Sequence, residues 1–167
     1  RPDINDKCDI KSRQKFFLEL EDAIKDYRDR TTVIAMHHPT NSYGEHGGQY
    51  SLRKQFYPKK MAVPLPGLGS FINVLRSTSG ASVEDVNNKR YRELMNRVTT
   101  LAQYSDRVIF ASGHEHTLQY FVENNTPQIV SGSGAKKGFT KLLNGSQFNT
   151  GKMGYATLEV YKDGSSR

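Results

Sequence analysis

The sequence of 167 residues lacks tryptophan, contains one cysteine, and has no apolar run approaching the length needed to span a membrane. With only Cys8 present, an internal disulfide is excluded. Hydrophobic residues make up 35% of the chain and the mean hydropathy is -0.69, values that are low for a globular domain without being those of a disordered chain. We therefore expect residues 1–167 to form a single domain with its own core.

Negative charge is scarce relative to positive charge. The 24 Lys and Arg residues outnumber the 17 Asp and Glu residues, which leaves a net charge of +7. Such an excess suits an anionic substrate, a nucleic acid or another polyanionic surface. No recognised nucleic-acid-binding motif is present, and no predicted helix interleaves basic and aromatic residues, so nucleic-acid binding is retained only as an alternative.

The spacing of apolar residues predicts an α/β fold. Helical periodicity covers residues 12–27 and 88–104, and each of these segments precedes a short apolar strand, at residues 31–36 and 107–111. Downstream we expect a hairpin of residues 118–122 and 128–131, a polar connection at 136–151, and a last alternating strand at 155–161. The stretch 51–86, rich in glycine, proline and basic residues, is expected to be an irregular insertion lying over the site.

All five histidines fall in two stretches that follow predicted strands. The members are His37, His38 and His46 after the first strand, and His114 and His116 after the second. Sites in α/β proteins form beyond the carboxyl ends of strands, so two neighbouring strands would bring these imidazoles together. Neutral imidazole nitrogens are good ligands for transition metals, and the spacing therefore predicts a metal site. The alternative is a pair of ordinary polar loops with structural histidines.

Two blocks carry a resemblance to a known family. The first is Val33-Ile34-Ala35-Met36-His37-His38-Pro39, a strand with a histidine two residues before proline, and the second is Gly113-His114-Glu115-His116. Flanking agreement comes from Glu45-His46-Gly47, Thr117-Leu118-Gln119-Tyr120 and Val130-Ser131-Gly132-Ser133-Gly134. In this order, the blocks resemble the C-terminal half of a calcineurin-like metallophosphoesterase, closest to the purple acid phosphatase branch. The resemblance implies half of a four-layer αββα sandwich, with a mixed sheet flanked by two amphipathic helices.

The resemblance also implies roles for individual residues. By position, His37 and His114 would bind one metal of a binuclear centre, and His116 would bind the other. His46 would be the catalytic proton donor, and His46 and Glu45 would bind the substrate. His38 takes the place of a non-ligand, and Glu115 is expected to be part of the loop structure.

The implied activity is hydrolysis of a phosphomonoester or phosphodiester by metal-bound hydroxide, with two Fe, Zn or Mn ions as cofactors. The family's carboxylate and amide ligands precede the first histidine strand, but no Gly-Asp or Gly-Asn-His motif occurs in residues 1–32. Because the chain begins at Arg1, we expect it to be a piece of a longer protein whose N-terminal half supplies these ligands. Alone it should bind at most one metal, weakly, and be inactive. The resemblance suits an exported or cell-envelope protein, and the sequence assigns no location. The alternative function is a non-catalytic basic binding or scaffold module with structural or zinc-binding histidines.

Overall fold

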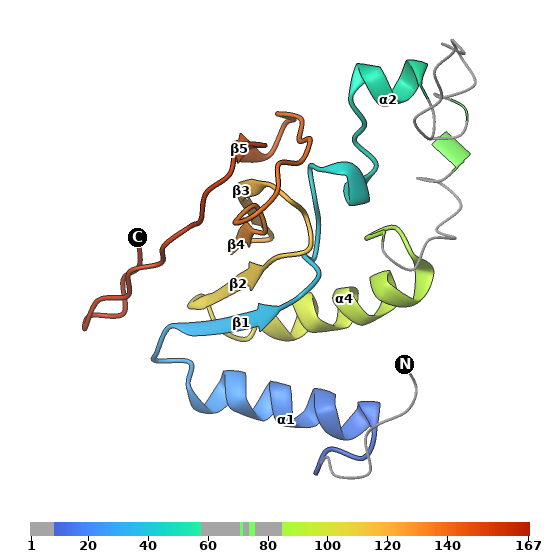
Figure 1. Ribbon diagram of the computed structural model, residues 1–167. Helices are drawn as coiled ribbons and strands as arrows, with labels where there is room; N and C mark the ends of the chain where they lie inside the picture. The colour runs from blue at the N-terminus through green and yellow to red at the C-terminus, as the bar shows by residue number, and fades with distance from the viewer. Residues whose placement is uncertain (1–8, 58–70, 72–73, 76–84) are drawn as a thin grey trace.

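The computed structural model describes residues 9–57, 71, 74–75 and 85–167, which form a mixed five-stranded sheet with three α-helices (Figure 1). The elements in chain order are α1 (Arg13–Asp26), β1 (Thr32–Met36), the 3-10 helix η1 (Glu45–Gly47), α2 (Leu52–Phe56), α4 (Lys89–Ala102), β2 (Val108–Ser112), β3 (Leu118–Glu123), β4 (Thr126–Ser131) and β5 (Ser146–Thr150). The strand order is β1-β2-β4-β3-β5. Strands β1, β2 and β4 are parallel, and β3 runs antiparallel to both of its neighbours. The predicted α/β fold is therefore confirmed.

Both long helices begin where the sequence pattern predicted. The side chain of Ser12 accepts a hydrogen bond from the backbone N–H of Lys15 at the start of α1, and Asn88 accepts from two backbone N–H groups at the start of α4. These side chains satisfy amide groups that have no partner within the helix. None of the helices in the described part of the chain is both long enough and apolar enough to cross a lipid bilayer.

Helices α1 and α4 cover one face of the sheet (Figure 1). Their buried side chains pack against Val108 and Phe110 of β2, each only 1% exposed. The buried members contributed by the helices are Phe17, Ile24, Met95, Val98, Leu101 and Ala102. Burying a side chain of this size stabilises a fold by roughly 1.5–3 kcal/mol, so this layer holds β1 and β2 in place.

The opposite face of the sheet is also apolar but only partly covered. Alternation along the strands directs Ile109, Tyr120 and Ile129 to this face, where a groove of about 370 Å³ lies between the sheet and residues 155–158. Several large apolar side chains remain exposed around it, including Val33 at 44%, Tyr120 at 38% and Phe148 at 51%. Strands that are apolar on both faces are typical of sheets covered on both sides.

The C-terminal part of the sheet differs from the sequence prediction in one strand. The hairpin of β3 and β4 is confirmed, and its turn contains Asn124 and Asn125, both with positive φ. The predicted last strand at residues 155–161 is wrong. The fifth strand is instead β5, within the segment predicted to be a polar connection. It pairs with β3 at the sheet edge, where backbone hydrogen bonds form the pairing and most side chains stay partly or fully exposed, so no apolar alternation is required.

The predicted insertion at residues 51–86 is described at its two ends and at residues 71, 74 and 75. Near its start lies the short helix α2, where the side chain of Ser51 accepts a hydrogen bond from the backbone N–H of Lys54. At the other end, Asp85 and Val86 are buried, and the backbone N–H of Val86 donates to the carbonyl of His46. The expectation that the whole insertion lies over the site falls mainly outside the described residues.

Candidate metal centre

The two histidine stretches meet because β1 and β2 are parallel neighbours. Their register pairs Met36 with Ser112, so both strands end at the same edge of the sheet. The backbone N–H of Gly113 then donates to the carbonyl of His37 over 3.1 Å and joins the two chain segments just beyond the strands. His114 follows with a φ of 62°, a left-handed conformation that is uncommon for a residue with a side chain. Such conformations are concentrated at functional sites.

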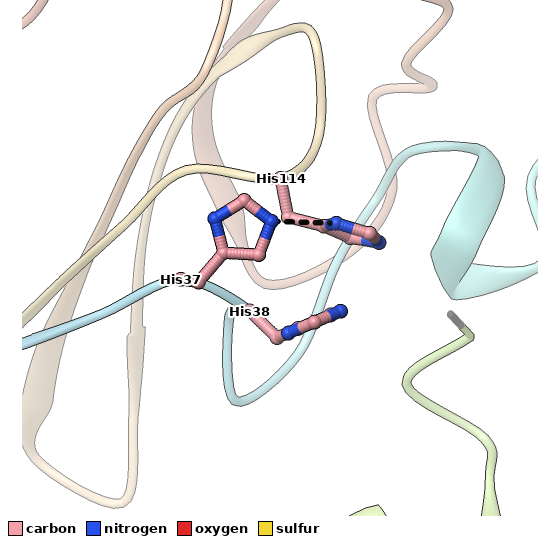
Figure 2. Close-up of side chains that lie close together, drawn as sticks. All are labelled: His37, His38 and His114. Atoms are coloured by element: carbon pink, nitrogen blue, oxygen red, sulfur yellow. Dashed lines mark hydrogen bonds between the residues drawn. The ribbon is translucent and has the colours of Figure 1, made fainter. Parts of the chain in front are cut away.

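Three imidazoles converge at this edge, those of His37, His38 and His114 (Figure 2). One nitrogen from each ring can be chosen so that all three lie within 4.8 Å of one another. Nδ1 of His114 lies 3.2 Å from Nε2 of His37, and the rings of His38 and His114 are 3.9 Å apart between centroids. A hydrogen bond between two imidazoles requires one unprotonated nitrogen, which is also the form that binds a metal. Three converging imidazole nitrogens suit a zinc ion with an open fourth position.

The turn that carries His37 and His38 is anchored to helix α4. The hydroxyl of Tyr91 lies 2.9 Å from the carbonyl oxygen of His38 and 2.7 Å from that of Pro39, and donates toward both. Burial raises the pKa of Tyr91 above its usual value, which keeps the hydroxyl protonated as a donor. The ring of His38 also packs against the ring of Tyr91, with centroids 5.5 Å apart. One helical side chain therefore fixes both the backbone and an imidazole of the candidate site.

His46 reaches the same site from further along the loop. Its ring lies against that of His114, with centroids 4.2 Å apart. Its Nδ1 is 3.1 Å from Oδ1 of Asp85, a carboxylate that is 2% exposed. The fourth imidazole is therefore next to the three-histidine group and paired with a buried acid.

A second buried carboxylate, that of Glu115, connects the two loops. Its Oε1 accepts hydrogen bonds from the hydroxyl of Ser42 over 2.6 Å and from the backbone N–H of His46 over 2.8 Å. Glycine is required on both sides of it: a Cβ at Gly44 would lie 2.5 Å from the carboxylate, and one at Gly132 would lie 2.0 Å from the Glu115 carbonyl. Since Ser42 and the backbone of His46 belong to the loop after β1, Glu115 acts as a brace between the two loops, and this matches the expectation that it is part of the loop structure.

The structure brings together most of the residues singled out from the sequence. His37 and His114 are adjacent, and His46 lies beside them. His116 is half-buried in the same turn but does not belong to the three-histidine group, whereas His38, expected to be a non-ligand, does. Glu45, expected to bind the substrate, forms an ion pair with Lys54.

Two residues of the site were missed at the sequence level. Asp85 lies in a stretch with no periodicity, so nothing local predicted that it would meet His46. The helical spacing of residues 88–104 places Tyr91 on the apolar stripe of α4, in its first turn. This turn lies nearest the carboxyl ends of the strands, which was the available signal. No protein-family model matches the chain, and no curated protein matches it either.

Proposed function

We propose that this chain carries the histidine-bearing part of a metal-dependent phosphoesterase, a hydrolase of the calcineurin-like type with a purple acid phosphatase-like centre. One observation supports this proposal most: His37 and His114, from separate stretches that each resemble a family motif, meet at one edge of the sheet with His46 beside them. Ordinary polar loops after these strands would share the same edge of the sheet, but they would not need four imidazoles close together there. The net charge of +7 also suits a phosphate-ester substrate.

The residues present fit a transition metal. Imidazole nitrogens suit zinc and iron, and the three candidate ligand atoms are close enough to share one ion. His37 and His114 would be ligands. A further ligand would be His38, which belongs to the three-histidine group, or His116, which the resemblance implies. A pair of metals would need anionic ligands as well, since neutral imidazoles do not offset the charge of two cations. We propose that another part of the protein supplies these carboxylates.

His46 would handle a proton in the reaction. When bound, the metal ions act as Lewis acids on a phosphoryl oxygen and lower the pKa of a water molecule. Beside that centre, His46 would hold a proton and give it to the leaving oxygen of the ester. Glu115 and Asp85 would keep His46 in place through its backbone N–H and its Nδ1, respectively. To bind the substrate as expected, Glu45 would have to give up its ion pair with Lys54.

The open face of the sheet supports the finer description of the fold. Tyr120, Phe148 and Val33 are apolar and exposed there, and β1 and β2 are apolar on both faces. We propose that a second sheet packs on this face to give the four-layer αββα sandwich. Covering it would bury side chains that are otherwise costly to leave in water.

The proposal is tested by metal analysis and an ester assay on residues 1–167 and on the same protein extended upstream. We expect the extended protein to bind two metals and to hydrolyse 4-nitrophenyl phosphate or bis(4-nitrophenyl) phosphate. Residues 1–167 alone should bind at most one metal, weakly, and show no appreciable hydrolysis. His114→Ala should abolish activity in the extended protein, and Asp163→Asn, at the far end of the strands, provides the control. Stoichiometric zinc binding without hydrolysis in either form would favour the alternative, a non-catalytic zinc-binding module.

A further inference from the structure

The backbone and the ring of His46 are held at three points by residues from distant parts of the chain. Its backbone N–H donates to Glu115, and its carbonyl accepts from the backbone N–H of Val86 over 3.1 Å. The third point is the ring, whose Nδ1 lies 3.1 Å from Oδ1 of Asp85. Because Asp85 and Val86 are consecutive, one short segment holds both the backbone and the imidazole of His46. An ordinary surface histidine has no such support.

Asp85 is the acid that faces the ring. Two other carboxylates lie close to His46 but serve different partners: Glu115 contacts its backbone N–H, and Glu45 pairs with Lys54. Asp85 is 2% exposed, and a buried carboxylate is costly unless hydrogen-bond donors compensate it. An ionised carboxylate only accepts hydrogen bonds, so the facing nitrogen of His46 must carry the hydrogen.

We propose that Asp85 is a positioning residue for His46: it accepts a hydrogen bond from Nδ1–H and leaves Nε2 as the nitrogen that acts in the site. The hydrogen bond made by one ring nitrogen of a histidine determines what the other can do. With Nδ1–H committed to Asp85, the ring can turn only by giving up that bond. The ring plane is thereby held against His114, 4.2 Å away between centroids.

The catalytic consequence of this assignment rests on the proposed function, whereas the tautomer does not. In a phosphoesterase, a protonated His46 would deliver the proton from Nε2 to the leaving oxygen, and Asp85 would set the angle of delivery. Misplacing a catalytic group by about 1 Å can cost about 100-fold in rate. The cost should depend on how much the leaving oxygen needs a proton.

The first arm of the test measures the tautomer in residues 1–167 with chelator present. Long-range ¹H–¹⁵N correlation spectra of the imidazoles at a pH of about 8.5, well above the usual range of histidine titration, distinguish Nδ1–H from Nε2–H. We expect the Nδ1–H form of His46 in the unsubstituted chain. Asp85→Ala should release the ring to a mixture of tautomers. Asp85→Asn, which keeps the side-chain volume and guards against loss of fold, should shift the same two nitrogen resonances by a smaller amount.

Asp163→Asn is the matched control for this arm. It makes the same change from carboxylate to amide, in a side chain whose Oδ1 accepts two hydrogen bonds from Ser165, but at the opposite end of the parallel strands. We expect the His46 resonances to be unchanged in this variant. An Nε2–H tautomer in the unsubstituted chain, or His46 resonances that move in neither Asp85 variant, would overturn the proposal.

The second arm measures hydrolysis by the metal-loaded protein extended upstream, with one ester that has a poor alkyl leaving group and one with a 4-nitrophenolate leaving group. Asp85→Ala should lower kcat for the alkyl ester by about 10- to 100-fold and change KM little, with a much smaller loss for the nitrophenyl ester. Equal losses for both esters would contradict proton delivery through His46. If the unsubstituted protein hydrolyses neither ester, the proposed function fails, and the tautomer measurement still decides whether Asp85 positions His46.

Discussion

The two loops that carry the histidines are built in different ways. The turn after β2 takes only five residues, Gly113 to Thr117, and is shaped by its own backbone: the N–H of Glu115 donates to Gly113 over 2.7 Å, and that of Thr117 donates to Glu115 over 2.8 Å. His114 adopts its left-handed conformation inside this turn. The backbone of this turn therefore determines the conformation in which it presents the imidazole of His114.

The loop after β1 depends instead on residues from elsewhere. The backbone N–H of Tyr43 donates to the side chain of Gln119 over 2.9 Å, Ser42 donates to Glu115, and Tyr91 holds the carbonyls beyond His37. Each of these contacts joins positions more than 50 residues apart in the chain. The loop that carries His37, His38 and His46 is therefore shaped by tertiary contacts, whereas the backbone conformation of His114 is set within its own turn. The site should consequently lose function in different ways when each loop is altered.

Among changes that leave the metals in place, removing His46 should have the largest effect on turnover. In the extended protein, His46→Ala should lower turnover by about 10²- to 10⁴-fold, the usual contribution of a general acid, while metal content stays nearly normal. Steady-state kinetics and elemental analysis of the same preparation check both statements. A His46→Ala protein that loses its metals would make His46 a ligand and contradict the proposed division of roles.

Removing His114 should deplete the metal itself. Loss of an outer hydrogen-bond partner of a ligand already costs about 10- to 100-fold in affinity, so His114→Ala should weaken zinc binding to residues 1–167 by at least about 100-fold. Titration calorimetry with zinc measures this. His38→Ala and His116→Ala sharpen the comparison: the geometry predicts that the first weakens zinc binding, whereas the sequence resemblance predicts it for the second. If the His114→Ala variant binds zinc as tightly as the unsubstituted chain, His114 is not a ligand and the candidate metal centre is wrong.

Removing the brace between the loops should affect folding stability. Glu115→Ala leaves the hydroxyl of Ser42 and the backbone N–H of His46 without their buried acceptor, and each such loss costs about 1–3 kcal/mol. Urea unfolding should show a lower free energy of unfolding than for Glu19→Ala, an exposed carboxylate on α1 that pairs with Lys15. Equal stability of the two variants would show that the loop after β1 does not depend on Glu115.

The smallest effect is expected from Tyr91→Phe. The change removes one donor from the carbonyls of His38 and Pro39 and keeps the ring, so the free energy of unfolding should fall by about 0.5–1.5 kcal/mol. Tyr161→Phe, which removes an exposed hydroxyl bonded to Glu159, is the matched control. Weaker zinc binding in Tyr91→Phe but not in Tyr161→Phe would show that α4 positions the histidine turn. If Tyr91→Phe is as stable as Tyr161→Phe, the Tyr91 hydroxyl does not stabilise the histidine turn.

The sequence pattern predicted elements whose signals are local. The apolar spacing in α1 and α4 and the short apolar runs of β1 and β2 are properties of consecutive residues, and these elements appear within one or two residues of their expected bounds. The sequence pattern did not predict β5, and the reason is physical. It joins the sheet by backbone hydrogen bonds to β3, and backbone groups are the same in every residue.

What the sequence determined by itself was that histidines would follow two strands, because strand ends and histidine positions can both be read along the chain. The tertiary structure alone decided which of them meet. The parallel pairing of β1 and β2 placed His37 against His114, and the turn held by Tyr91 brought in His38. The pairing of His46 with Asp85, 39 positions later, depends on where an irregular segment returns to the fold. Such contacts between distant residues follow from packing, and no local pattern encodes them.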